Sequence, residues 1–518
     1  MNSLSVLSAY NLSPYAFKKF DNGTVPFAEA CRKAAALPEC KKLLILTSSS
    51  QKNIIASFLK EIDFLTAKYE VKEIDGFTAH TIFTEAAKSV QADSAVSNVF
   101  FLQADTPFID LKLACDLFNR HIEYKAEYSF VDGYPAGLAP EIVNAGLCKI
   151  LAKVSEDDKS EACKTFLFDT VKKDINNYDI ETIIAPYDLR YLRLQFAADC
   201  KRNFLLCKSF TDINSENYAE LIEQRSEKLF TLPAYYGIEI IAESPLHSIY
   251  KPEQQPGKAP MDKKSLFSLV EKIAAFSDDA VISLSILGEP ALYPNIEEII
   301  EKILSYPKLS VLIETSGLYW KNGSAEKIAQ AVKKAPHREN RMEPLYWIVD
   351  IDAVSSSMYA KVHRLPDDEA NAKLKQAVTF TDNIHKMFPS SVWAQTIRMN
   401  ENEAELEPFY RFWKELGVNV IIQKFDTFCK VLDDKRVADL SPFERRPCWH
   451  LKRDMYILSD GTVPLCKEDI FCKNVLGNAF SDSFDTIRQK ALIAYKEHLD
   501  CKYGGLCEFC DEYYTFNF

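Results

Sequence analysis

The sequence lacks a long hydrophobic run and a continuous basic region. None of its 518 residues belongs to a stretch that approaches the roughly 20 apolar residues needed to span a bilayer, and Met1 to Leu7 carry no basic leader. The formal net charge is −12, with Lys and Arg spread among acidic residues. A strongly basic surface for nucleic acid is therefore excluded. We expect a cytoplasmic protein that binds neither membrane nor nucleic acid.

Two local absences limit the chemistry further. No cysteine lies between Cys207 and Cys429, and no glycine lies between Leu7 and Phe20. The first gap leaves the middle of the chain without thiolate ligands for a soft metal. The second leaves the N-terminus without the flexible backbone that usually wraps a phosphate group.

The chain is long enough, at 47% hydrophobic content, for two to four domains. Residues 1–215 alternate apolar strands such as 42–47 and 99–103 with helical patterns such as 111–121. Strand and helix alternation of this kind predicts an α/β domain with a largely parallel sheet.

Residues 228–430 repeat that alternation, which predicts a partial (β/α) barrel. A helix is expected at 264–276 and a proline-containing loop at 251–258. The expected strands are 237–242, 280–287, 309–314, 345–351 and 418–423. A third domain, residues 440–518, is small and rich in cysteine, and a domain of this size commonly needs a metal for stability.

The last seventy-one residues hold six of the fourteen cysteines. Asp460-Gly461 predicts a hairpin turn between two short strands, and a helix is expected at 485–498. The spacing, which ends in C-x2-C, fits either zinc or an iron-sulfur cluster. Two complete four-iron clusters would need eight thiolates, so one is the maximum. The other eight cysteines are expected to be small buried residues. The six are Cys448, Cys466, Cys472, Cys501, Cys507 and Cys510.

This pattern resembles the SPASM domain, an auxiliary cluster-binding module that follows many radical S-adenosylmethionine (SAM) enzymes. The resemblance implies Cys448, Cys466, Cys507 and Cys510 as ligands of one [4Fe-4S] cluster and favours iron over the alternative, zinc. Cys472 and Cys501 are then either alternative ligands or ordinary thiols.

The middle segment resembles a radical SAM barrel. The family's three cluster cysteines align with Ser244, Ser248 and Lys251, and neither a hydroxyl nor an ammonium replaces a thiolate on iron. We expect the catalytic cluster to be lost. Gly288-Glu289-Pro290 resembles the motif that binds the SAM amino group, so a vestigial SAM site at Gly288, Glu289 and Pro290 is an alternative hypothesis. Residues 313–317 and 350–364 resemble later loops of the same barrel.

The segment Phe101 to Asp110 resembles the D-x-P loop of sugar-nucleotide cytidylyltransferases, in which an aspartate, here Asp105, holds magnesium. Without a glycine-bearing phosphate loop, we expect residues 1–215 to form a degenerate nucleotidyltransferase-like domain that binds or docks.

The three resemblances in this order are those of the spiro-SPASM family. The resemblance implies an iron-sulfur protein related to radical SAM peptide- and protein-modifying enzymes, with an auxiliary, docking or electron-transfer role and a protein or peptide partner. Two alternatives are an active radical SAM enzyme and a sugar nucleotidyltransferase that acts through Asp105.

Overall fold

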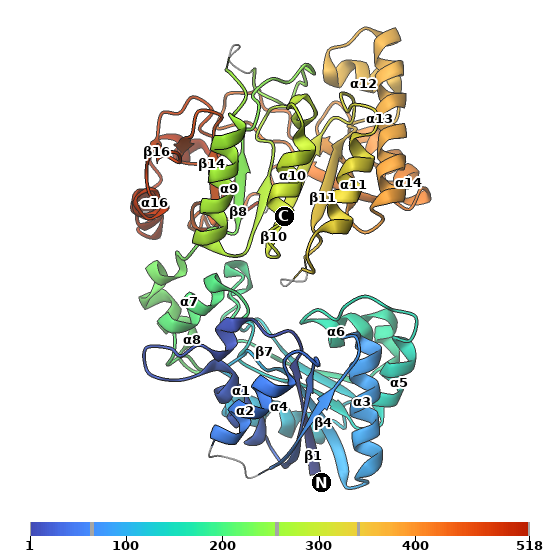
Figure 1. The fold of residues 1–518 in the computed structure, drawn as a ribbon, viewed down its shortest axis with the longest axis vertical. Helices are drawn as coiled ribbons and strands as arrows, with labels where there is room; N and C mark the ends of the chain where they lie inside the picture. Colours follow the sequence, from blue (N-terminus) through green and yellow to red (C-terminus); the bar gives the residue numbers. More distant parts are fainter. Residues whose placement is uncertain (1, 63–66, 254–257, 339–341, 516–518) are drawn as a thin grey trace. The chain divides into compact units, whose positions relative to one another are not determined.

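The computed structural model describes residues 2–62, 67–253, 258–338 and 342–515. The chain forms two compact units, Met1–Lys228 and Leu229–Phe518, each built on a seven-stranded sheet (Figure 1). The predicted α/β class with parallel sheets is confirmed. No helix within the described ranges is long and apolar enough to cross a membrane.

In the first unit the sheet has the strand order β3-β2-β1-β4-β6-β5-β7, and only β6 runs antiparallel to its neighbours. Its central strands are buried on both faces, as parallel strands covered by helices usually are. The strands are β1 (Asn2–Ala9), β2 (Cys40–Thr47), β3 (Lys68–Glu73), β4 (Val96–Gln103), β5 (Tyr128–Asp132), β6 (Glu141–Asn144) and β7 (Ile180–Ile184).

Helices and loops cover both faces of this sheet and form two apolar cores with it. The predicted helix 111–121 is confirmed as α4, where Asp110 caps the N-terminus by accepting from Lys112 N and Leu113 N at 2.8 and 3.1 Å. The helices are α1 (Pro26–Ala35), α2 (Lys52–Glu61), α3 (Ala79–Ala92), α4 (Leu111–Glu123), α5 (Leu147–Val154), α6 (Phe166–Val171), α7 (Lys201–Ser209) and α8 (Tyr218–Gln224).

In the second unit six parallel strands follow one another in chain order, and a seventh, β14, joins the sheet beside β8. The order is β13-β12-β11-β10-β9-β8-β14. These strands are β8 (Tyr235–Ile238), β9 (Ala280–Ser283), β10 (Leu309–Thr315), β11 (Leu345–Asp350), β12 (Val392–Arg398), β13 (Asn419–Lys424) and β14 (Asp454–Ile457).

Helices join successive strands of this sheet and bury a large apolar core against one face. In α9 the side chains of Leu266, Leu269, Val270 and Ile273 are buried at helical spacing, and Asp262 caps the first turn. The helices are α9 (Lys263–Ser277), α10 (Ile296–Leu304), α11 (Ser324–Lys334), α12 (Ser356–His363), α13 (Asp367–Met387), α14 (Leu406–Glu415), α15 (Trp449–Arg453) and α16 (Phe484–Leu499).

Some predicted boundaries are wrong. The strands predicted at 237–242 and 280–287 end early, at Ile238 and Ser283, because the chain turns into loops at the carboxyl edge of the sheet. Strand β12 was not predicted: Val392 to Arg398 shows no strict alternation of apolar and polar residues, and most of the strand is buried. The predicted loop at 251–258 falls partly on residues 254–257, which lie outside the described ranges.

The cysteine-rich tail is part of the same compact unit as the barrel-like sheet. The predicted turn is confirmed at Gly461, whose φ is +84°, and Leu458 N donates to Thr462 O at 2.8 Å. The flanking strands, however, belong to different sheets: β14 pairs with β8, whereas β15 (Thr462–Pro464) pairs with β16 (Val475–Asn478). The helix predicted at 485–498 is confirmed as α16.

Candidate metal centre

The four cysteines predicted as ligands come from three separate pieces of the tail. Cys448 is the N-cap residue of α15, and Cys466 follows β15 by two residues. Cys507 lies inside the short 3-10 helix η7 (Gly505–Phe509), and Cys510 directly follows it. Cys448 is buried, and the other three are partly exposed.

The four thiols lie within electrostatic reach of one another, since Cys507 and Cys510 act on both Cys448 and Cys466. The pKa of Cys448 is raised by burial first and then by Cys510 and Cys507. The pKa of Cys466 is raised by burial, by Glu468 and by the same two thiols together with Cys448. Burial and Cys510 raise the pKa of Cys507 to about 11. Clustered thiols that repel one another as anions form a site that a cation would stabilise.

Hydrogen bonds fix the backbone around the four thiols. Glu512 N donates to Cys510 Sγ at 3.3 Å, and the Arg445 guanidinium donates to the carbonyl of Cys507. Cys448 N donates to Nδ1 of the buried His498 at 3.2 Å. Contacts of this kind hold ligand atoms in place before a metal arrives.

Cys472 and Cys501 interact mainly with groups other than these four thiols. The groups that act most on Cys472, after burial, are Lys258 and Asp469, although Cys472 lines the same cavity as Cys466. Cys501 is exposed and its thiol interacts with Tyr503. The choice of the four ligands, with Cys472 and Cys501 as alternatives, therefore stays a prediction.

A fifth thiol was missed by sequence reasoning. Cys429, which follows β13 and lies outside the tail, forms a side-chain hydrogen bond with Cys510 and feels the charge of Cys466. It is one of the eight cysteines outside the tail that are predicted to be small buried residues. That expectation holds for Cys31, Cys40, Cys148, Cys200 and Cys207 but is wrong for Cys429 and for the exposed Cys115 and Cys163. Cys115 lies off the buried stripe of α4.

Three carboxylates border the thiols. Oxygen atoms of Asp426, Asp511 and Glu512 lie within 4.8 Å of one another. Lys467 Nζ lies 2.8 Å from Asp426 Oδ2, and Lys424 Nζ lies 3.0 Å from Asp511 Oδ2 and also contacts Glu512. Arg436 Nη1 also lies 2.7 Å from Asp511 Oδ2, so three cations pair with these three acids in an ion-pair layer beside the thiols.

The barrel positions that align with the missing cluster cysteines are occupied by other interactions. Lys251 Nζ donates to Asp350 Oδ2 at 2.9 Å, and Gln395 Nε2 donates to Asp350 Oδ1 at 2.8 Å. Asp350 is 3% exposed, so this ion pair lies inside the protein. Ser244 is partly exposed and bonds only locally, to Leu246 O at 3.4 Å.

Ser248 belongs to a second buried network. Its Oγ lies 2.9 Å from His363 Nδ1, and His363 Nε2 lies 3.4 Å from Asp352 Oδ2. Tyr250 donates to the same Asp352 oxygen at 2.7 Å. Burial lowers the pKa of His363 to about 3, so the ring is neutral. Two of the three aligned positions, Ser248 and Lys251, therefore already interact with other side chains of the protein.

The predicted SAM-motif residues Gly288, Glu289 and Pro290 are buried. The Glu289 carboxylate accepts from Thr315 Oγ1 at 2.5 Å, and from Ser316 N and Oγ at 2.9 and 2.6 Å. A Cβ on Gly288 would meet Ile241 O at 1.9 Å, so only glycine fits there. The motif thus joins three strand ends to one another, and its role in SAM binding stays a prediction.

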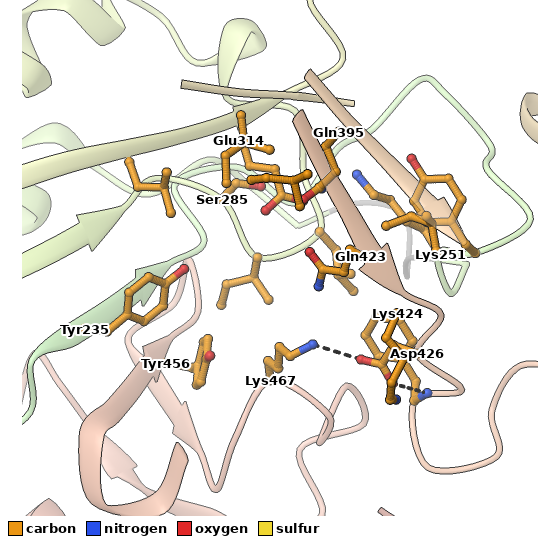
Figure 2. Close-up of a pocket in the computed structure, with 18 residues that line it drawn as sticks. Tyr235, Lys251, Ser285, Glu314, Gln395, Gln423, Lys424, Asp426, Tyr456 and Lys467 are labelled. Carbon is orange, nitrogen blue, oxygen red and sulfur yellow. Dashed lines mark hydrogen bonds and ion pairs between the residues drawn. The ribbon is translucent and has the colours of Figure 1, made fainter. Parts of the chain in front are cut away.

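A cavity of about 170 Å³ lies on the face of the sheet that carries Leu312 and Ile348, and Figure 2 shows the side chains that line it. Its polar lining includes Glu314 from β10, Gln395 from β12 and Gln423 from β13, with the Lys467–Asp426 ion pair at its edge. Burial, and then the charge of Asp350, raises the pKa of Glu314 to about 7.

In the first unit Asp105 lies just after the end of β4, as predicted, but its carboxylate pairs with a lysine. Lys164 Nζ donates to Asp105 Oδ2 at 3.1 Å and to Asp199 Oδ2 at 2.8 Å. Asp105 is 5% exposed. An ammonium between two carboxylates occupies the position that a divalent cation would need.

A family model for the SPASM iron-sulfur cluster-binding domain matches residues 448–511. This confirms the predicted SPASM resemblance of the tail, and all four predicted ligands lie within the match. Cys429 lies outside it.

Two solved structures are similar over part of the chain. A cytidylyltransferase from Leptospira borgpetersenii serovar Hardjo-bovis is 13% identical, with a TM-score of 0.36 over 44% of this chain and 97% of that chain. Streptococcus suis SuiB bound to S-adenosylmethionine is 11% identical, with a TM-score of 0.40 over 57% of this chain and 76% of that chain. Such low scores support no conclusion about this chain.

A curated relative from Treponema pallidum (strain Nichols), described as an uncharacterized protein, is 49% identical over 360 residues. The match covers 69% of this chain and 99% of the relative. The chain therefore belongs to the same protein family as this Treponema pallidum protein.

Proposed function

We propose that the protein carries one [4Fe-4S] cluster on Cys448, Cys466, Cys507 and Cys510. We further propose that it serves a partner peptide- or protein-modifying enzyme by electron transfer or docking, without radical chemistry of its own. The observation that carries this proposal is the contrast between two sites. Thiols converge in the tail, whereas buried polar networks occupy the aligned positions in the barrel.

The donor set fits an iron-sulfur cluster better than zinc. Four thiolates at 2.3 Å from one zinc would place the sulfur atoms about 3.8 Å apart. Among the described residues, which include every cysteine, no three cysteine sulfurs lie within 4.8 Å of one another. A four-iron cluster spreads its ligands more widely, because each thiolate binds a different iron. When bound, the cluster would supply a one-electron carrier.

The position of the thiols suits exchange with a partner. Cys466, Cys507 and Cys510 are partly exposed, and Phe509, between the last two, is 46% exposed. A cluster held there would lie close to the surface. An exposed aromatic side chain beside it offers apolar contact area to a docking protein.

The barrel supports the absence of radical chemistry. Binding a catalytic cluster would require thiolates where Ser248 and Lys251 now pair with His363 and Asp350. Breaking the Lys251–Asp350 pair would leave a carboxylate buried without its cation, which is strongly unfavourable.

The first test is elemental analysis of anaerobically purified protein, with iron, acid-labile sulfide and zinc measured per chain. We expect about four irons and about four sulfides. Cys507→Ser should lose the iron, and the matched control Cys501→Ser, which removes a nearby thiol outside the cluster, should keep it. Zinc without sulfide would contradict the cluster assignment, and clearly more iron would mean that the barrel holds a cluster too.

The absence of radical chemistry has its own test. With a strong reductant and SAM, the purified protein should form no 5′-deoxyadenosine above the level seen in the same mixture without protein. Reductant-dependent formation by the unmodified protein would show that it is an active radical SAM enzyme.

A further inference from the structure

Cys429 comes from a different part of the fold than the four predicted ligands. It follows β13, the edge strand of the sheet, and precedes the SPASM match by nineteen positions in the printed sequence. Its thiol hydrogen-bonds to Cys510, and Cys466 also lies within electrostatic reach. Five thiols therefore converge where a cluster would use four.

The backbone around Cys429 adopts an unusual conformation. Phe428, Cys429 and Lys430 have φ values of 47°, 54° and 70°, the left-handed region that residues other than glycine rarely occupy. Phe428 N donates to Asp426 Oδ1 at 2.7 Å, and Leu432 N donates to Thr427 O at 3.0 Å. These bonds hold the strained turn independently of the thiol itself.

The same turn is anchored to the C-x2-C segment by contacts that do not involve sulfur. Lys430 Nζ lies 4.1 Å from the centre of the Phe509 ring. Lys424 Nζ and Arg436 Nη1 lie 3.0 and 2.7 Å from Asp511 Oδ2. The neighbours of Cys429 on both sides thus place it beside Cys510. If either thiol is removed, the other should keep its position.

We propose that Cys429 and Cys510 share one ligand position of the metal centre, so that either thiolate can complete the cluster when the other is absent. The proposal rests on the proposed function, since it assumes a cluster on the tail. We expect no such substitute for Cys448, Cys466 and Cys507, because Cys429 interacts directly with Cys510 and acts on Cys466 only through its charge. Removing any one of these three thiols should abolish the four-iron cluster, whereas removing Cys510 alone should not.

The test is an alanine series in the full-length protein. Iron and sulfide per chain and the electron paramagnetic resonance spectrum are measured after anaerobic purification and reconstitution. Cys429→Ala and Cys510→Ala should each keep a four-iron cluster, and the double variant should lose it or give a three-iron signal. Cys510→Ala with Cys472→Ala is the matched control and should keep the cluster.

The outcomes separate the two proposals. If Cys510→Ala alone loses the fourth iron, or if the Cys429/Cys510 double variant keeps an intact cluster, the shared position is wrong and the tail cluster still stands. If Cys448→Ala or Cys507→Ala keeps the cluster, the proposed function itself is wrong. Far-UV circular dichroism of each variant shows whether iron loss comes from a lost ligand or from unfolding, and iron loss with an unchanged spectrum counts as ligand loss.

Discussion

At the scale of single residues, a lysine ammonium pairs with acidic side chains at two places where the family resemblances would put a metal. Lys251 pairs with Asp350 in the barrel, and Lys164 lies between Asp105 and Asp199 in the first unit. A partly buried ammonium satisfies buried carboxylates that would otherwise need another cation or protons. Each lysine is therefore required once its partner acids are buried.

Replacing Lys251 by Met should destabilise the protein by about 3 kcal/mol, because Asp350 would be left buried without its counter-charge. The measurement is the free energy of unfolding from urea titration.

The control is the double variant Lys251→Met with Asp350→Asn, which removes both charges. It should recover a large part of the lost stability. If the double variant were as unstable as the sum of the two single variants, the ion pair would not be the cause.

Glu141, at the start of β6, gives a pH prediction. Burial raises its pKa from the usual 4.5 to about 7, although the Tyr128 hydroxyl, which donates to it, acts in the opposite direction. The folded state keeps this proton to higher pH than the unfolded state does. Its stabilising contribution is therefore complete below pH 4.5 and is lost as the pH rises through about 7.

The variant Glu141→Gln cannot lose a proton at this position. Relative to the unmodified protein, it should gain stability between about pH 6 and about pH 8. Urea midpoints at the two pH values give the comparison, and an unchanged difference between the two proteins would contradict the assignment.

At the scale of secondary-structure elements, α16 positions α15, the helix whose N-cap residue is Cys448. Arg488, on α16 and 6% exposed, donates to Leu451 O, Lys452 O and Thr231 O, each at 3.0 Å. Its guanidinium also lies 3.7 Å from the centre of the Phe230 ring. One side chain thus ties α15 and the entry to β8 onto α16.

Replacing Arg488 by Leu should leave these carbonyls without a donor and cost about 3 kcal/mol. We also expect slower cluster reconstitution, since the position of Cys448 depends on α15. Urea unfolding and the rate of recovery of the visible spectrum test the two effects. As a control, Lys490→Leu changes an exposed position of the same helix and should alter neither.

At the scale of the whole molecule, metal binding is expected in one compact unit only. The thiols lie in Leu229–Phe518, whereas in the first unit Lys164 already occupies the space between Asp105 and Asp199. Manganese should therefore leave the melting temperature of the unmodified protein unchanged.

Lys164→Ala should lower the melting temperature, and manganese should restore part of the loss, because the two carboxylates would then need a cation. The control Lys164→Ala with Asp105→Asn should not respond to manganese. A response of the unmodified protein would contradict the assignment and would support nucleotidyltransferase chemistry.

Local sequence predicted the elements that rest on periodicity and capping. Helices α4, α9 and α16 lie within two residues of their predicted bounds, because each has an apolar stripe and a polar residue at its start. The ends of β8 and β9 and the existence of β12 were not predicted correctly. Strand ends depend on which neighbour supplies hydrogen bonds, and that is a property of the sheet.

The sequence by itself determined the α/β class, the cysteine-rich tail and the absence of thiolates from the middle of the chain. Those features depend on residue type and short spacing, which are visible along the chain. Only the tertiary structure decided that Cys429 meets Cys510 and that lysines pair with Asp105 and Asp350. Contacts between residues 35 to 99 positions apart depend on how strands order and loops close, and no local pattern specifies that.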